Sequence, residues 1–158
     1  SRKSKVKSRK SKVESQKSKV ESQKSKVKSR KSKVESQKLE VMREFESLNV
    51  WKEAKAVTLD IYEIFKDCRD YGFKDQIQRA SVSIMNNIAE GSESGSDAKF
   101  INFLNIAKGS CGEVRSMLYL CSTLGFCTPE TEATLQARCK KISGGITRLI
   151  EYLSSNRH

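Results

Sequence analysis

Apolar residues from Ser47 onward recur every three or four positions, which is the spacing of an amphipathic α-helix. This pattern predicts four helices, over residues 48–68, 74–93, 97–124 and from 129 onward. No segment alternates apolar and polar residues as a half-buried strand would. Four helices of this length joined by short links predict an all-α fold, an antiparallel up-down four-helix bundle.

The ends of the predicted helices carry recognisable signals. Ser96 is a good N-cap for the third helix, because its hydroxyl can accept a free backbone N–H. Thr128 is predicted to cap the fourth helix, with Pro129 at the first helical position, where no N–H is missed. Gly72 is predicted to break the first helix from the second, and a turn is expected over residues 91–95.

Residues 1–41 follow a different pattern, a seven-residue repeat with the unit Ser-Arg-Lys-Ser-Lys-Val-Glu. Each unit has one apolar residue, whereas a coiled coil needs two in every heptad. A lone valine stripe has nothing to pack against, and serine and valine do not promote helix. The sequence therefore predicts a low-complexity basic tail that is solvated and fluctuating.

A tandem DNA repeat explains the tail, because three copies of the heptanucleotide AGTCGAA encode this heptapeptide. The two variable positions, Arg or Gln and Glu or Lys, both follow from one G-to-A change in the heptanucleotide. Such DNA encodes the same peptide in every forward frame and contains no stop codon. We therefore interpret residues 1–41 as a candidate for translated repeat DNA, and Met42 as a candidate for the true start.

The formal charge of +12 first suggests a nucleic-acid binder, but its location changes that interpretation. Residues 1–41 hold 16 Lys and Arg against 4 Glu, whereas residues 42–158 hold 15 basic and 15 acidic side chains. The predicted bundle is therefore neutral and lacks the charge that drives non-specific binding to phosphate. No stretch has the length and apolarity of a membrane span or a signal peptide, so we expect a cytoplasmic protein without membrane contact.

The predicted bundle lacks the residues of the common catalytic and metal sites. The sole histidine is His158, so a carboxylate–histidine metal site and a histidine acid/base pair both lack an essential residue. The five cysteines have scattered spacings without a CxxC pair, which favours reduced, mostly buried thiols. We expect no catalytic residue, no metal, no cofactor and no small-molecule substrate.

The apolar residues of the predicted bundle are more numerous than one inner stripe per helix requires. The surplus includes Phe73, Tyr119, Phe126 and Tyr152. Surplus apolar surface on a small domain predicts an interface between copies of the chain.

Several runs of residues lie on three of the predicted helices, namely Leu48–Ala54, Gln76–Ile84, Asn87–Gly91, and Phe103–Ser110 followed by Glu113. These motifs resemble the 23S rRNA intervening-sequence protein family. The resemblance covers residues 43–153 and none of the tail. The chain departs from the family after Ala-Glu-Gly, where an acidic and serine-rich link replaces a basic one.

The resemblance implies a bacterial four-helix bundle that assembles as a homopentamer and has no established chemistry. Some members are encoded within inserts in 23S rRNA genes and are loosely labelled ribosomal. The related accessory proteins of diversity-generating retroelements bind nucleic acid and associate with a reverse transcriptase. Three functional classes therefore stay open: a non-catalytic oligomeric scaffold or adaptor, which we favour; an RNA- or ribosome-associated protein, or a retroelement accessory protein; and an enzyme, which the missing chemistry disfavours.

Eight residues of the family-like motifs are candidate site residues, which we interpret as structural. Charged members could mark an RNA or partner surface, but buried charges persist only when they are paired, which favours ion pairs or hydrogen bonds in the bundle. Amide side chains could contact unpaired bases, yet in a bundle they more often bond between helices. Candidate nucleic-acid contacts are Arg79 and Arg115. The eight residues are Trp51, Arg79, Asn87, Glu90, Gly91, Asn105, Gly109 and Glu113.

Overall fold

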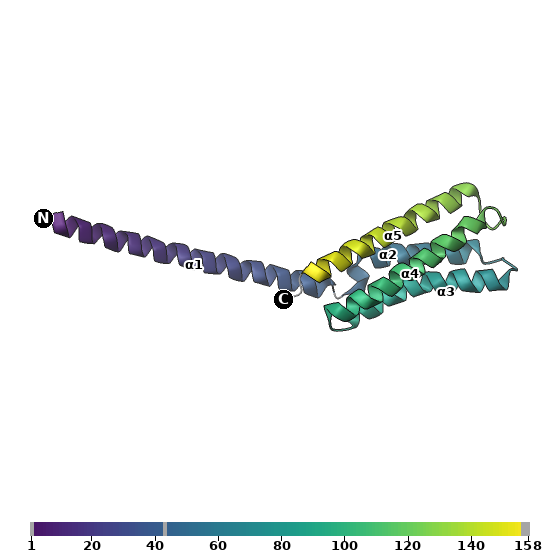
Figure 1. Ribbon diagram of the computed structural model, residues 1–158, viewed down its shortest axis with the longest axis horizontal. Helices are drawn as coiled ribbons and strands as arrows, with labels where there is room; N and C mark the ends of the chain where they lie inside the picture. The colour runs from purple at the N-terminus through teal and green to yellow at the C-terminus, as the bar shows by residue number, and fades with distance from the viewer. Residues whose placement is uncertain (1, 43, 156–158) are drawn as a thin grey trace. The chain divides into compact units, whose positions relative to one another are not determined.

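The computed structural model describes residues 2–42 and 44–155, and the described residues are helical apart from short links (Figure 1). The chain divides into two compact units, Ser1–Val41 and Met42–His158. This division falls where the net charge of the sequence changes from strongly positive to zero.

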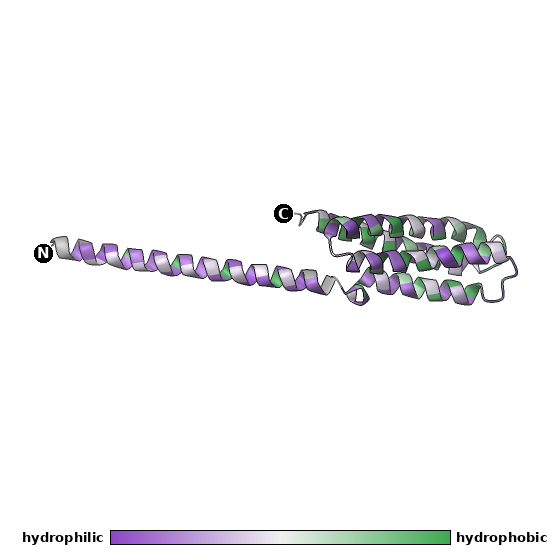
Figure 2. Cartoon of the chain, turned by 90° about the horizontal axis from the view of Figure 1, so that it is seen from below, coloured by the Kyte–Doolittle hydropathy of each residue, from purple (hydrophilic) through white to green (hydrophobic). Residues whose placement is uncertain are grey.

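The first unit is a single helix, α1, which spans Arg2–Met42. Every side chain of α1 whose exposure is described is exposed, including Val20 and Val27 at 48% and 64%. The sequence predicts a fluctuating segment here, whereas the structure has one continuous helix. The physical reason for a helix is that Lys, Arg, Gln and Glu fill about half of each heptad and all have high helix propensity. In Figure 2 this helix is mostly purple and pale, with scattered green.

The second unit is a bundle of four long helices, α2 (Asn49–Ile64), α3 (Tyr71–Glu93), α4 (Asp97–Cys121) and α5 (Pro129–Ser155), preceded by a short 3-10 turn over Phe45–Ser47. Neighbouring helices run in opposite directions, and α3 packs against both α2 and α4 (Figure 1). The four helices and the antiparallel order confirm the fold predicted from the apolar pattern.

The core of the bundle is made by one apolar stripe from each helix. In α4 the buried residues are spaced alternately by four and three positions, from Phe100 to Cys121. This spacing keeps one face of the helix on the core over its whole length. The largest fully buried side chains are Val57, Ile61, Phe65, Ile77, Ile84, Ile88, Leu104, Val114, Leu118, Ile142, Ile146 and Leu153.

The helix ends agree with the predicted caps at two places. The Ser96 hydroxyl accepts a hydrogen bond from the backbone N–H of Lys99 at 3.4 Å, and α4 begins at the next residue. The Thr128 hydroxyl accepts from the N–H of Thr131 at 3.2 Å, and α5 begins at Pro129. The polar signals at these two starts were sufficient to place them.

The predicted start of the second helix and the predicted start of the turn after it were wrong, whereas the predicted helix end at Glu93 is confirmed. The start of α3 is set by Asp70, whose carboxylate accepts from the N–H of Phe73 at 3.0 Å, so Gly72 lies in the first turn of the helix rather than in the link. Gly91 lies inside α3 rather than in a turn, and the turn itself is made by Gly95, which has a φ of +79°. The sequence analysis interpreted both glycines as helix breakers. Gly91 instead lies within a helix, at a point where α3 and α4 pack closely.

Two glycines permit close packing between helices. A Cβ atom on Gly91 would lie 2.7 Å from Cδ2 of Phe100 and 2.8 Å from Cβ of Phe103, so α3 and α4 could not approach as they do. A Cβ on Gly145 would lie 2.6 Å from Cγ1 of Val50, which brings α2 against α5 in the same way. The close approach of α2 to α5 at this point therefore requires glycine at position 145.

Among the described residues, no helix is long and apolar enough to cross a membrane.

Candidate functional site

The outer side of the contact between α3 and α4 carries half of the polar residues of the family-like motifs. We call this surface the polar seam and define it by its hydrogen-bonded and hollow-lining side chains. On α3 these are Gln76, Arg79, Ser83, Asn87 and Glu90, and on α4 they are Asn102, Ser110 and Glu113.

Hydrogen bonds connect the two helices along the polar seam. The amide Nε2 of Gln76 donates to Oε1 of Glu113 at 3.3 Å. The hydroxyls of Ser83 and Ser110 lie 2.8 Å apart, and the Asn87 amide donates to the carbonyl of Ser83 at 2.8 Å and to its hydroxyl at 3.1 Å. The small hydroxyl side chains let the two helices lie close together while their polar atoms stay bonded.

Two surface hollows lie at the ends of the polar seam. The first, of about 570 Å³, is lined by Gly72, Asp75, Gln76, Arg79, Ala80, Ser83 and Glu113. The second, of about 600 Å³, is lined by Glu90, Glu93, Ser94, Lys99, Asn102, Phe103 and Ile106. Each hollow has two carboxylates and one cation in its lining, and the Arg79 guanidinium is already 3.6 Å from Asp75. A surface with this balance of charge does not attract phosphate.

The structure brings together four of the eight predicted site residues. Arg79, Asn87, Glu90 and Glu113 lie on the polar seam. Gly91 lies beneath it, where α3 meets Phe100 of α4. Bonds within the bundle support the structural interpretation of Asn87 and Glu113, and Arg79 has a pairing partner although its side chain is 79% exposed.

The other three predicted residues lie apart from these bonds. Trp51 is half-buried at the start of α2, edge-on to Phe45 with ring centroids 5.0 Å apart, and the Lys55 ammonium lies 5.4 Å from its ring. Asn105 and Gly109 are exposed on α4. A Cβ added at Gly109 would meet no described atom within 4 Å, so the bundle itself does not require glycine there.

The two candidate nucleic-acid contacts do not form one surface. Arg79 lies on the polar seam, whereas Arg115 lies on the side of α4 that faces α5, where its carbonyl accepts from Nε2 of Gln136 at 2.9 Å. The Nε atom of Arg115 is buried, and its charge acts on Cys111 and Cys139 between the two helices. The two residues therefore contact different helix pairs.

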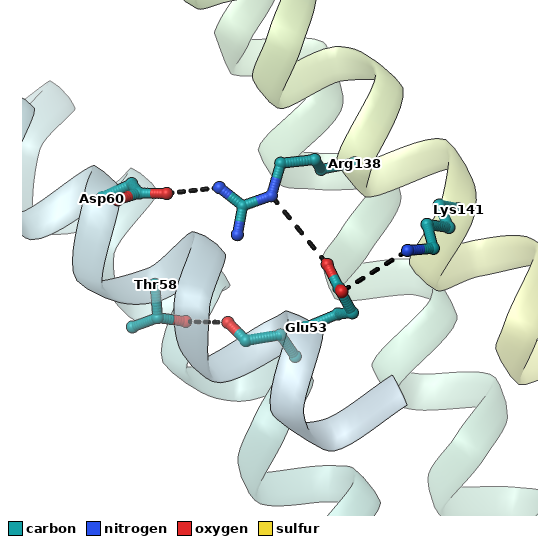
Figure 3. A network of polar contacts seen from close by, with 6 residues as sticks. Glu53, Thr58, Asp60, Arg138 and Lys141 are labelled. Atoms are coloured by element: carbon teal, nitrogen blue, oxygen red, sulfur yellow. Dashed lines mark hydrogen bonds and ion pairs between the residues drawn. The ribbon is translucent and has the colours of Figure 1, made fainter. Parts of the chain in front are cut away.

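Sequence reasoning missed an ion-pair network between α2 and α5 (Figure 3). The Arg138 guanidinium pairs with Asp60, and its Nε lies 3.9 Å from Oε2 of Glu53. The Lys141 ammonium lies 3.4 Å from the other oxygen of Glu53. The signal was in the sequence, because acidic residues seven apart and basic residues three apart each share a helix face, but choosing the partner helix required the fold.

In addition to this ion-pair network, a buried hydrogen bond from Thr58 joins α2 to α3. The buried hydroxyl of Thr58 lies 2.8 Å from the carbonyl of Ala54 in its own helix and 3.1 Å from the carbonyl of Ser81. The α2 helix is therefore held on one side by buried hydrogen bonding and on the other by half-exposed ion pairs.

The five cysteines are free thiols, three of them buried and two half-buried. Burial raises the pKa of Cys121 to about 12, and burial likewise raises the pKa of Cys127. A thiol with a raised pKa is a poor nucleophile and a poor metal ligand at neutral pH. Within residues 2–42 and 44–155, no group of histidine, cysteine and carboxylate side chains is arranged to hold a metal ion.

A sequence model of the family described as 23S rRNA-intervening sequence protein matches residues 46–148, which lie within the second unit. A similar solved structure is a protein with unknown function from the S23 ribosomal protein family of Bacteroides thetaiotaomicron VPI-5482, at 26% identity and a TM-score of 0.60. The aligned region covers 64% of this chain and 97% of that chain. The comparison with curated proteins gives no match.

Proposed function

Because the chain belongs to the 23S rRNA-intervening sequence protein family, we propose that its bundle is a non-catalytic scaffold or adaptor that works as a closed homo-oligomer, a pentamer. The family relationship supports the bundle and carries no chemistry with it. The contact between copies is inferred from the surface of the bundle, and the number of five copies from the family resemblance.

The observation that carries this proposal is the number of large apolar side chains left exposed on a neutral domain. They lie on the outer faces of α2 and α4, at the start of α3 and in the link after α4, and their exposed fractions run from 45% to 74%. Where apolar residues of this size form a contiguous exposed surface, that surface is typical of a site that binds another protein. They are Leu59, Tyr62, Tyr71, Ile106, Tyr119, Leu120 and Leu124.

The distribution of these residues favours a ring over a two-fold dimer. Leu59 and Tyr62 are on α2, whereas Tyr119 and Leu120 are on α4, and α2 and α4 are not neighbours in the bundle. Two different apolar surfaces on one chain suit a contact in which one face of a copy binds the other face of the next copy. Contacts of this kind close into rings when the rotation permits.

Gly109 adds support from the same helix. Glycine inside a helix costs about 0.5–1 kcal/mol relative to alanine, and the bundle gives no packing reason for it at this exposed position. A neighbouring copy that packs its backbone closely on α4 would supply the reason.

The neutral bundle and the acidic majority in both hollows count against RNA binding by the bundle itself. The scaffold proposal therefore assigns the exposed surfaces to protein contacts.

Light scattering after size exclusion tests the proposal. The full chain, of 17.9 kDa, should elute as one species of about 90 kDa at micromolar concentration. Leu120→Asp and Leu59→Asp should each lower this mass, because a carboxylate would be buried in the contact. Ala137→Asp, at an exposed position on α5, which carries none of the seven residues, is the matched control and should leave the mass unchanged. A concentration-independent mass of one chain would refute the assembly and the scaffold function together.

A further inference from the structure

The α1 helix has the charge and exposure of a binding surface, and the proposed function of the bundle does not use it. Residues 1–41 hold 16 Lys and Arg against 4 Glu, so this segment carries the whole net charge of the chain. Its described side chains are all exposed, from Lys5 to Glu40 apart from those masked between them. A helix with no buried face is stabilised only by propensity and local pairs, unless a ligand adds to them.

The lysines of α1 form two regular series. Lys10, Lys17, Lys24 and Lys31 recur every seven residues, about 10.5 Å apart along the axis, and drift only about 20° around the helix per repeat. The second series, Lys12, Lys19, Lys26 and Lys33, starts two residues later and so lies on the opposite side of the helix. Cations therefore lie on both sides of α1 along its length.

The apolar content of α1 excludes two other partners. A helix that lies on a membrane buries a broad apolar face, usually with aromatic residues or leucines. Here each complete repeat has a single valine, the segment has no aromatic residue, and Val13 to Val34 form one narrow stripe. The same stripe is too narrow for a coiled coil with a second helix.

We propose that α1 binds the phosphodiester backbone of nucleic acid without sequence preference. The partner that remains is a regularly spaced polyanion, and nucleic acids supply one negative charge for every few ångströms of length. The segment carries no aromatic ring with which to stack on bases, and most of its cations are lysines, which bind phosphate as point charges. Binding should therefore depend on the number of cations and on salt rather than on the base sequence.

The test measures the affinity of the full chain for labelled RNA and DNA of several sequences over a range of salt. Affinity should fall by about 10³-fold or more between 50 and 200 mM salt, as for six or more phosphate contacts. Scrambled sequences should bind equally well. RNA and DNA share the same phosphodiester chemistry, so the affinity for each is measured separately to show which of them α1 binds.

Matched triple variants locate the binding. Lys17, Lys24 and Lys31 of α1 are changed together to Gln, and in a second protein Lys52, Lys108 and Lys140, which are exposed on the bundle, are changed together to Gln. Both remove the same charge, and Gln keeps a high helix propensity. The α1 variant should lose about 10- to 500-fold in affinity at 100 mM salt and two to three units of salt slope, whereas the bundle variant should lose less than threefold. A third protein, in which the same three lysines of α1 are changed to Arg, keeps the charge and should retain both the affinity and the salt slope.

Several results would overturn the proposal. The first is an equal loss of affinity in the two Lys→Gln variants. The second is a preference of at least about tenfold for one base sequence at fixed salt, and the third is the absence of any salt-dependent binding. Binding to phosphatidylserine vesicles as strong as to RNA at the same salt would assign α1 to an anionic lipid surface instead. The mass of the assembled protein is measured in parallel, so that failure of the oligomer and failure of α1 binding are told apart.

Discussion

The α1 helix and the four helices of the bundle have the same backbone structure for different reasons. In α4, apolar residues at alternating steps of four and three place a continuous stripe on the core. In α1, one valine in seven leaves the helix polar on nearly every side. Helices α2 to α5 are therefore stabilised by side-chain burial, whereas α1 has only the propensities of its residues and its local pairs. A helix assignment alone does not tell these two cases apart.

The largest expected effect separates the two regions by the cost of removing an apolar side chain. Leu104→Ala removes a side chain with no exposed surface and should lower the free energy of unfolding by about 2–5 kcal/mol. Val20→Ala in α1 removes one that is 48% exposed and should change it by less than about 0.5 kcal/mol. Denaturant unfolding at one fixed protein concentration measures both. A comparable loss in the two variants would mean that α1 is packed in solution.

A second, smaller effect compares two glycines of the bundle. Gly91→Ala should destabilise the protein by about 1–3 kcal/mol, because the new methyl group meets Phe100 and Phe103. If only contacts within the bundle determine stability, Gly109→Ala should raise the melting temperature, because the new methyl group meets no neighbouring atom. The rise should correspond to about 0.5–1 kcal/mol in the free energy of unfolding. Thermal unfolding measures the change in stability of each variant, and light scattering measures whether the assembled mass is kept. A Gly109→Ala protein that loses its assembled mass would place this face of α4 in the contact between copies.

The smallest expected effect concerns pH. Hydrogen bonds from Ser122, of its hydroxyl first and its N–H second, lower the pKa of Glu132, and Oε2 of Glu132 lies 2.8 Å from that N–H. Because the pKa of Glu132 is lower in the folded than in the unfolded protein, its carboxylate stabilises the fold at any pH above the unfolded-state pKa. This stabilisation is lost as the pH falls through the folded-state pKa. The melting temperature should therefore fall between about pH 5 and about pH 3, and less so in Glu132→Gln.

The control for this prediction lies in the other region. Glu21→Gln changes an exposed carboxylate of α1 and should leave the pH profile as it is. If Glu21→Gln flattens the profile as much as Glu132→Gln does, the link from Ser122 to Glu132 contributes nothing specific.

Local sequence signals predicted most of the fold. The spacing of apolar residues gave the four helices, and the hydroxyl caps at Ser96 and Thr128 gave two of their starts, because caps act within one turn of chain. The errors at Gly72 and Gly91 have a common cause. A glycine looks the same in sequence whether it begins a turn, lies in a first helical turn or accommodates a neighbouring ring, and only the packing distinguishes these.

The candidate site was predicted in part. The helical spacing of Arg79, Asn87 and Glu90 is consistent with one face of α3, and the structure places that face beside Glu113. Which helix lies opposite could not be read from the sequence. For the same reason, Arg79 and Arg115 were grouped although they face different helices, and the pairing of Glu53 with Arg138 was missed.

The repeat of α1 has a consequence for how a long ligand would move on it. Because the same lysines return every seven residues, a displacement of about 10.5 Å along the axis restores nearly the same set of charges. A polyanion bound to α1 therefore has several equivalent registers in place of one best position. Exchange between them needs only a few contacts to break at a time, so the bound partner would slide along the helix while it stays attached.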